Sequence, residues 1–293
     1  MTSLTKVKVW IVTACVLSAS AILCSTASAS AYKAAVLADN PVAYWRLGDS
    51  GTVAVDQVGN NNGEYLDDAV VGVTPSATAD GDTAATFNNG SAQVVVSPTH
   101  DSINMGTVNG QPQGTIEVWF KWDGTMSRRA LVSNRPDCGA PCQDQSNYQF
   151  YLREGNATSY NGNSSGELNW GHAATPNQWT HYVFTIDDDT STGTLYVNGG
   201  TAAGGSEHQA TGIQFGSHGG KPDPDIFRIG RFPHSGTNES FSGDIDEVAI
   251  YRGILSADRI AAHFNAASIP EPVSILLLSS GILGLVCLRR RQG

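Results

Sequence analysis

The chain has 293 residues, of which 40% are hydrophobic and 15% are charged, so it can bury a sizeable core and is not a disordered chain. Its formal net charge is −10. Two end segments, residues 1–31 and 268–293, hold five of the 17 Lys and Arg but only one of the 27 Asp and Glu. The residues between them therefore include 12 basic and 26 acidic side chains. This acidic middle argues against nucleic acid or an anionic membrane surface as its partner.

The first 31 residues have the organisation of a secretory signal peptide. Two lysines precede an apolar run over residues 9–24, and small residues follow that run. We expect a signal peptidase to cut after Ala29 or after Ala31, which gives a mature chain that starts near Tyr32. A lipoprotein signal is the weaker alternative, because Leu23 is too bulky for the small-residue pattern that precedes a lipidated cysteine.

Residues 32–267 have the pattern of short strands separated by clusters of Gly, Asn, Asp and Pro. In residues 115–122, the apolar side chains Ile116, Val118 and Phe120 recur at every second position and so share one face of a strand. Nine more strands are expected at 43–47, 84–87, 93–96, 148–152, 167–170, 178–186, 194–197, 226–229 and 246–251. So many strands with little helix predict an all-β fold, a two-sheet antiparallel jelly-roll sandwich.

Two helices and one tight turn are expected within this domain. Ser256 can cap a helix that runs to about residue 266, and Asp258 lies in its first turn, where the helix dipole favours a negative charge. A second, short helix is expected just before residues 39–41. The Asn198-Gly199 pair is typical of a type I′ hairpin turn.

Of the five cysteines, only Cys138 and Cys142 lie between the two end segments. A close pair in a Gly/Pro loop of an exported chain predicts a local disulfide. A metal site is the alternative, but it would need two more ligands of matching spacing, and the sequence has no second pair of this kind. Because the closed loop is short, the stabilisation should be at the low end of about 2–4 kcal/mol, so the bond would mainly hold one loop in place.

The C-terminal segment, residues 268–293, combines an apolar run with an arginine cluster. Residues 273–288 carry no charge and would span about 24 Å as a helix, against a hydrocarbon core of about 30 Å. This length suits a transient anchor better than a permanent one. Arg289, Arg290 and Arg291 should stay on the cytoplasmic side and leave the domain outside. A buried C-terminal helix of the domain is the alternative.

Pro270, Glu271 and Pro272, followed by the apolar run and the terminal arginines, resemble the PEP-CTERM sorting tail of Gram-negative bacteria. The resemblance implies processing by exosortase, a membrane-embedded cysteine transpeptidase, after a transient stay in the inner membrane. It also implies export to the cell surface or the extracellular matrix. The two prolines keep the motif extended just outside the bilayer, where an enzyme can bind it.

Several stretches resemble, in chain order, the laminin-G-like, concanavalin A-like jelly-roll domain. They are residues 35–49 (AVLADNPVAYWRLGD), 56–65, 114–122, 177–187, 193–199, 227–231 and 241–264 (FSGDIDEVAIYRGILSADRIAAHF). The last stretch is the most specific, and the resemblance covers nearly all of residues 32–267. It implies two packed antiparallel sheets with a concave face or rim loops that, in various members, bind glycans or protein ligands, often beside a calcium ion.

Glycoside hydrolases of related folds align carboxylates on one strand as E-x-D-x-x-E. The nearest match is GDIDEV, residues 243–248, in which Asp244, Asp246 and Val248 are expected to share a face. The two aspartates could flank a glycosidic bond, but the third position is apolar. Residues 162–166 (GNSSG) match G-x-S-x-G only formally, because a nucleophile elbow needs a strand before and a helix after, whereas here NATSYN precedes and a strand follows.

Asp56 and Asn60 lie in an Asn/Gly loop that can turn its carbonyl groups inward, and oxygen ligands suit a hard cation. The resemblance places the strand of Asp246 beside the N-terminal strand that leads to this loop. We therefore expect Asp56, Asn60 and Asp246 to meet at one calcium ion. The alternative is that Asp56 and Asn60 make Asx turns and that Asp246 caps the end of a strand.

Most tryptophans of this domain lie in predicted strands, where core packing is their default role. Trp170 is followed by Gly171 and His172 near a strand end, so Trp170 and His172 are the pair that we expect to contact a ligand such as a sugar.

Together these features predict an exported, single-domain jelly roll that acts as a non-catalytic glycan-binding or adhesion module. Its partner would be an extracellular polysaccharide or a surface glycan. Two alternatives stay open: a secreted glycosidase that uses Asp244 and Asp246, and a structural matrix protein without a specific ligand.

Overall fold

The computed structural model of the chain describes residues 30–59, 61–88, 90–96, 103, 106–108, 111–135, 148–161, 166–213, 226–232 and 239–268. Residues 1–29 of the expected signal peptide, the Cys138–Cys142 pair, Asn60 and residues 269–293 of the sorting tail, with Pro270 to Pro272, lie outside the described residues. None of the helices within these ranges has the length and apolar composition that crossing a bilayer requires.

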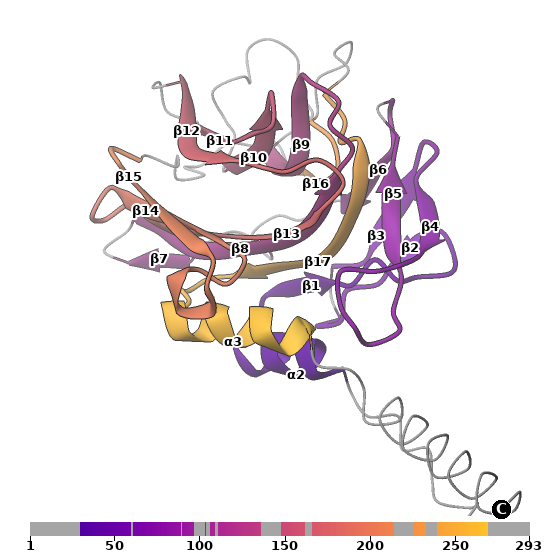
Figure 1. Cartoon of the computed structure of the whole chain (residues 1–293), viewed down its shortest axis with the longest axis horizontal. Coiled ribbons are helices and arrows are strands. Elements are labelled where there is room, and N and C mark those ends of the chain that lie inside the picture. The colour runs from indigo at the N-terminus through magenta and orange to yellow at the C-terminus, as the bar shows by residue number, and fades with distance from the viewer. Residues whose placement is uncertain are drawn as a thin grey trace, which may run out of the picture.

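The described strands form two antiparallel sheets that face each other, as predicted for a jelly-roll sandwich (Figure 1). Sheet A runs in the order β15 (Ser206–Thr211), β14 (Thr192–Val197), β13 (Trp179–Asp187), β8 (Gln111–Trp122), β17 (Gly243–Tyr251), β5 (Ala84–Phe87) and β4 (Val70–Val73). In addition, β1 (Ala43–Trp45) pairs with β17, and β7 (Gly106–Val108) pairs with β8. Sheet B runs in the order β12 (Gly166–Ala173), β11 (Asn156–Asn161), β10 (Tyr148–Arg153), β9 (Arg128–Arg135), β16 (Ile226–Ile229), β6 (Gln93–Val96), β3 (Gly63–Leu66) and β2 (Val53–Ala54).

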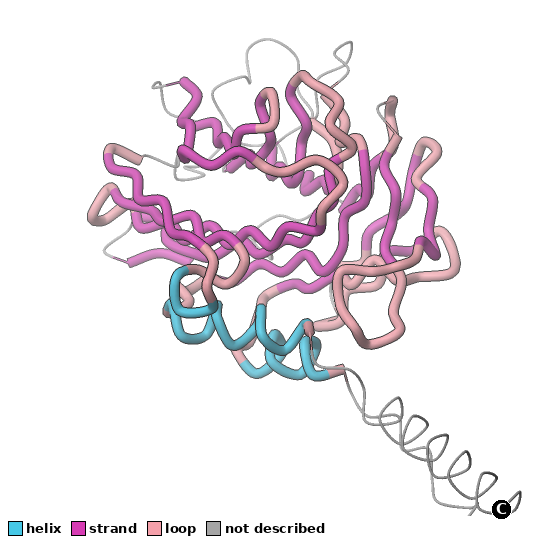
Figure 2. The backbone as a smooth tube through the Cα atoms, viewed as in Figure 1, coloured by secondary structure: helices cyan, strands magenta, loops and turns pink. Residues whose placement is uncertain are grey.

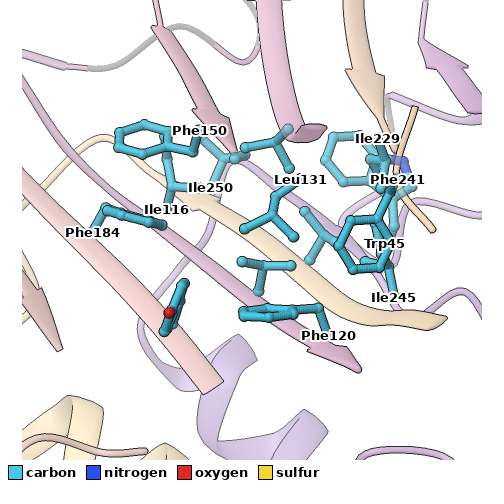
Figure 3. Packing of buried hydrophobic residues seen from close by; sticks show 14 of the residues in the cluster. Trp45, Ile116, Phe120, Leu131, Phe150, Phe184, Ile229, Phe241, Ile245 and Ile250 are labelled. Atoms are coloured by element: carbon cyan, nitrogen blue, oxygen red, sulfur yellow. The ribbon is translucent and has the colours of Figure 1, made fainter. Parts of the chain in front are cut away.

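The main core fills the space between the two sheets (Figure 3). The predicted alternation in β8 is confirmed, because Ile116, Val118 and Phe120 all lie in this core. Aromatic rings join the sheets directly: the ring centroids of Phe150 on β10 and Phe184 on β13 are 4.1 Å apart. Each fully buried side chain of this size contributes about 1.5–3 kcal/mol, so this layer supplies most of the driving force for folding.

The two described α-helices lie against the outer face of sheet A (Figures 1 and 2). They are α2 (Ala31–Ala38) and α3 (Ala257–Ala267), and both were expected. The Ser256 hydroxyl accepts a hydrogen bond from the Arg259 backbone N–H, which confirms the predicted N-cap of α3. A second hydrophobic cluster, which includes Tyr32, Trp119 and Tyr251, fills the space between the helices and the sheet. The helices therefore cover part of the outer face of sheet A.

Seven described strands were not predicted: β2, β3, β4, β7, β9, β11 and β15. Most of them are short or have polar sequences, so they lack the run of alternating apolar residues from which a strand is predicted. Residues 156–161 (NATSYN) form β11, a strand directly before residues 162–166. The assumption that no strand precedes this G-x-S-x-G match was wrong. The segment is still followed by a strand, β12, and not by the helix that a nucleophile elbow needs.

The Asn198-Gly199 turn has the expected backbone but not the expected role. Asn198 has φ +50° and Gly199 has φ +78°, the positive values that a type I′ turn requires. However, β14 and β15 are joined by the longer segment 198–205, which includes a 3₁₀ helix, η2 (Thr201–Ala203). The turn starts this connection and does not by itself form the hairpin.

Candidate functional site

A β-bulge on β17 determines which of its acidic side chains lie together. The pairing of β17 with β8 shifts register after Asp246, and Glu247 has φ +51°. A bulge adds one residue to one strand, so the in–out alternation starts again after it. Val248 therefore lies in the main core, and the prediction that it shares a face with Asp244 and Asp246 was wrong.

Glu247 instead joins a charged cluster on the outer side of sheet A. Its Oε1 lies 3.0 Å from Nη2 of Arg46, and the Tyr44 hydroxyl donates a hydrogen bond to its Oε2. The same Nη2 lies 2.5 Å from Asp80 Oδ2 and 2.8 Å from Asp82 Oδ2. Both aspartates belong to the β4–β5 loop, residues 74–83. One guanidinium thus binds this loop to the bulge of β17.

Asp246 is fully buried next to this cluster. Its Oδ2 accepts a hydrogen bond of 2.9 Å from the backbone N–H of Ala77 in the β4–β5 loop, while its Oδ1 has no hydrogen-bond partner among the described residues. Burial raises the pKa of Asp246 well above its usual value, and the neighbouring Glu247 raises it further. Since Glu247 has Arg46 as its partner and its pKa is raised only to about 7, we assign the higher pKa of the two carboxyls to Asp246.

Asp244 and Asp246, the predicted catalytic pair, are therefore buried. Asp246 is not exposed, and Asp244 is 7% exposed. Asp244 also forms an ion pair of 2.5 Å with Nζ of Lys121 and accepts a hydrogen bond of 2.5 Å from the Thr86 hydroxyl. Two carboxyls that cleave a glycosidic bond have to reach it from both sides. A polysaccharide could reach Asp246 only after the β4–β5 loop had moved.

Asp56 follows β2 and forms an isolated bridge with Trp45 of β1, which pairs with β17. Its carboxylate accepts hydrogen bonds from backbone N–H groups at 2.9–3.0 Å, those of Tyr44, Val58 and Asn61. The bond from Val58 closes an Asx turn, which is the arrangement that the alternative interpretation required. These N–H donors occupy positions on the carboxylate that a cation would need.

No group of three or more His, Cys, Asp or Glu within the described ranges is arranged to hold a metal ion. Asp246 bonds to the β4–β5 loop, whereas Asp56 bonds to its own loop and to β1. Asn60 lies outside the described residues. Calcium at Asp56, Asn60 and Asp246 therefore stays a prediction.

Trp170 lies in the core and not at a ligand surface. It is 3% exposed, its indole N–H donates a hydrogen bond of 3.1 Å to the Ser159 hydroxyl, and its ring packs edge-on against Phe184. Both faces of the indole are thus unavailable for stacking on a sugar, in contrast to the expectation. The neighbouring His172 is partly exposed, and its Nδ1 lies 2.6 Å from the Tyr182 hydroxyl.

A buried charged network, which the sequence analysis missed, centres on Glu117 of β8. Four side chains contact its carboxylate at 2.8–3.0 Å, namely Tyr32, His181, Tyr251 and His263. Burial alone would raise the pKa of Glu117, but His263 and His181 hold it well below its usual range. The sequence signal was present: an acidic residue in the otherwise apolar stretch TIEVWF.

His263 of α3 connects this network to α2. Its Nδ1 lies 3.0 Å from Glu117 Oε2, and its Nε2 lies 2.8 Å from Asp39 Oδ2 at the C-terminal end of α2. Burial alone would lower the pKa of His263, but the carboxylates of Glu117 and Asp39 raise it overall. The network fastens both helices to sheet A, which is a structural role.

The outer face of sheet B carries a row of hydrogen-bonding side chains. Each of these residues lies directly opposite the next one on the neighbouring strand. From β16 to β12 they are Arg228, Ser133, Gln149, Tyr160 and Glu167. Directly paired residues project from the same side of a sheet. Because Phe150, the chain neighbour of Gln149, lies in the main core, this row is on the opposite, outer side. We call these five residues the polar row.

Gln149, at the centre of the polar row, is 5% exposed, and its Nε2 has no hydrogen-bond partner within the described part of the chain. A buried amide without a partner costs about 1–3 kcal/mol, so it marks a position where a ligand oxygen would be favourable. Tyr160 is partly buried and packs against a small aromatic cluster with Tyr151 and Phe232. At the end of the row, Glu167 lies 2.5 Å from Arg128.

The fold thus defines an antiparallel two-sheet sandwich with one outer face covered by helices and the other lined with polar and aromatic side chains. The family model described as the concanavalin A-like lectin/glucanases superfamily matches residues 88–261, more than half of the chain, and the chain belongs to this family. The resemblance noted in the sequence is confirmed for this domain. No curated protein matches the chain.

Solved structures with a similar fold include binding domains of toxins and an enzyme. The binding domain of Paraclostridial Mosquitocidal Protein 1 has a TM-score of 0.53 at 18% identity, with 78% of this chain and 53% of that chain covered. The botulinum neurotoxin serotype D binding domain has a TM-score of 0.52 at 13% identity, with 78% and 52% covered. Trypanosoma rangeli sialidase has a TM-score of 0.52 at 13% identity, with 76% and 32% covered. The chain spans about half of each toxin domain and about a third of the sialidase, and these likenesses show the fold alone.

Proposed function

We propose that this protein is a non-catalytic module that binds an extracellular polysaccharide or surface glycan through the polar row of sheet B. The observation that carries this proposal is Gln149, whose buried Nε2 has no hydrogen-bond partner in the described ranges. It lies in a row of five polar or aromatic side chains, of which Tyr160 and Glu167 are partly exposed. Membership of a superfamily whose description names lectins and glucanases supports a carbohydrate ligand.

The chemistry of the polar row suits a neutral sugar. Sugar hydroxyls both donate and accept, so they can pair with the amide of Gln149 and the carboxylate of Glu167. The ring of Tyr160 offers an apolar face for the C–H side of a sugar. The acidic charge of the whole chain disfavours a strongly anionic polymer.

A glycosidase that uses Asp244 and Asp246 is the second candidate, since the family description also names glucanases. The burial of Asp246 and the ion pair of Asp244 favour the non-catalytic module. If the purified protein released reducing sugar from a polysaccharide and Asp246→Asn abolished that release, the glycosidase would replace our proposal.

We also propose that the protein is exported, held transiently in the inner membrane by its C-terminal segment, processed by exosortase and released to the surface or matrix of a Gram-negative bacterium. The support is the sequence alone: the PEP motif at residues 270–272, the uncharged run at 273–288 and the arginines at 289–291.

The glycan proposal is tested by measuring binding to a panel of polysaccharides with four variants. Gln149→Ala and Tyr160→Ala should each weaken binding about two- to tenfold, which corresponds to one lost hydrogen bond or stacking contact. Gln209→Ala and Tyr196→Ala are matched controls, because they remove the same residue types from β15 and β14 of sheet A. Equal affinities for all four variants, or no binding to any polysaccharide, would contradict the proposal.

A further inference from the structure

His172 and His208 lie next to each other where edge strands of the two sheets meet. His172 is on β12, the last strand of sheet B, and His208 is on β15, the last strand of sheet A, on the same side of the sandwich (Figure 1). Their ring centroids are 5.4 Å apart, and the ring planes are inclined by 64°, so the rings do not stack. Both side chains are partly exposed, so the pair can be reached from solvent.

One nitrogen of each ring is held by a hydroxyl group. Nδ1 of His172 lies 2.6 Å from the Tyr182 hydroxyl, and Nε2 of His208 lies 3.0 Å from the Ser206 hydroxyl. The other two nitrogens, Nε2 of His172 and Nδ1 of His208, have no hydrogen-bond partner among the described residues. A histidine that binds a metal uses one nitrogen as the ligand and fixes its ring by donating a hydrogen bond from the other. Both rings have the hydrogen bonds that this arrangement requires.

The free nitrogen of His208 points toward the strand of His172. This Nδ1 lies 3.7 Å from the position that a Cβ atom on Gly171 would take, and Gly171 directly precedes His172 on β12. Gly171 has φ +76°, a backbone conformation that favours glycine. Because glycine has no side chain, the space beside this nitrogen stays open.

The separation of the rings suits two ligands of one metal ion. Since a histidine nitrogen lies about 2.0–2.1 Å from zinc, two histidines on one tetrahedral zinc ion have ring centres about 5 Å apart. Burial lowers the pKa of His172, and the charge of His208 lowers it further, so the His172 ring is neutral at pH 7 and can bind a cation. Imidazole nitrogen suits zinc, copper and nickel, whereas calcium takes oxygen ligands.

We propose that His172 and His208 bind one transition-metal dication, such as zinc, which joins the edge strands of the two sheets. Nε2 of His172 and Nδ1 of His208 are the protein ligands, and water completes the coordination shell. A site with two protein ligands binds more weakly than a structural zinc site, which has four. The proposal is independent of the glycan proposal, because neither histidine belongs to the polar row.

The test is a calorimetric zinc titration of the purified full chain at neutral pH, with His172→Gln and His208→Gln as variants. The parent should bind one more zinc ion than either variant. Glu207→Gln is the matched control, because Glu207 is the chain neighbour of His208 and its carboxylate bonds to Thr201 instead. This control should bind as many ions as the parent. Equal zinc binding by the parent and both histidine variants would overturn the proposal.

The melting temperature gives a second measurement on the same proteins. Zinc should raise it in the parent, because the ion binds the folded arrangement of the two strands. The rise should be absent in each histidine variant and should disappear at about pH 5, where protons compete for both nitrogens. The melting temperatures without zinc show that each variant is folded, and if one variant is not folded, the other decides the test. A zinc-induced rise that persists in a folded histidine variant would contradict the site.

Copper gives a direct view of the ligands. With Cu²⁺ in place of zinc, electron paramagnetic resonance of the parent should show coupling to two imidazole nitrogens. Each histidine variant should lose this two-nitrogen signal. A spectrum that is the same in the parent and in both variants would show that the ion binds elsewhere and would overturn the proposal.

Discussion

Asp246 and Glu247 are neighbours in sequence and equally buried, and burial raises the pKa of both, that of Glu247 to about 7, but they differ in partners. Glu247 faces the guanidinium of Arg46, whereas Asp246 receives one backbone N–H, from Ala77. Two adjacent buried carboxylates repel each other, so the one with the weaker partners keeps its proton. A carboxyl that is neutral in the folded protein opposes folding once the pH exceeds its unfolded pKa of about 3.9.

We predict that Asp246→Asn is tolerated. The amide oxygen can still accept the N–H of Ala77, and the substitution removes a group whose raised pKa lowers stability as the pH rises. The free energy of unfolding of the variant relative to the parent should therefore increase with pH from about 4 upward. Glu247→Gln should lose about 1.5–3 kcal/mol, because it weakens a hydrogen-bonded ion pair. Urea denaturation at pH 4, 6 and 8 measures both, and a large loss in Asp246→Asn at pH 8 would show that Asp246 is charged.

At the scale of elements, the Glu117 network fastens α2 and α3 to sheet A. His263 lies between Glu117 and Asp39, whose carboxylates raise its pKa and so favour its charged form, and the three groups come from β8, α3 and the end of α2. Breaking a buried ion pair leaves an unpaired charge behind, which costs about 3–5 kcal/mol. The helices should therefore be more strongly held while His263 carries its proton.

We predict that His263→Gln destabilises the protein in a pH-dependent way. A histidine whose folded pKa is raised contributes stability that is fully present below its unfolded pKa of about 6.5 and is lost as the pH rises through the folded value. The difference in melting temperature between parent and variant should thus be largest near pH 6 and smaller at pH 9. His208→Gln, on the partly exposed strand β15, is the control. A pH-independent difference would contradict a charged His263.

At the scale of the whole molecule, the two sheets share one core, but their outer faces are different. The helices and the β4–β5 loop cover part of sheet A, and sheet B carries the polar row, in which Arg228, Ser133 and Gln149 are buried. The predicted calcium ion would add a further connection, since Asp56 precedes β3 of sheet B and Asp246 lies on β17 of sheet A. An ion that binds only the folded state stabilises it by about 2.7 kcal/mol at a hundredfold excess over its Kd.

If Asp56, Asn60 and Asp246 hold calcium, a chelator should lower the melting temperature, and added calcium should restore it. Asp56→Asn should abolish this response, whereas Asp189→Asn in the exposed turn after β13 should keep it. An unchanged melting temperature with chelator would reject the site and leave the Asx turn as the role of Asp56.

The sequence alone predicted the fold class, most of the long strands, both described helices and the N-cap at Ser256. These features depend on local patterns: apolar residues at every second position define the buried face of a strand, and a capping hydroxyl defines the start of a helix. The same patterns placed Trp170 in a strand, but the prediction that it contacts a ligand was wrong, because its indole lies in the core.

The candidate sites needed the tertiary structure. The bulge at Glu247 reverses the face of every later residue on β17, and a one-residue shift of this kind leaves no clear mark in the sequence. His263 and Glu117 are 146 residues apart, and the polar row exists only because the register aligns five strands. Local sequence determines which way a side chain points, but strand register and loop packing determine which side chain it meets.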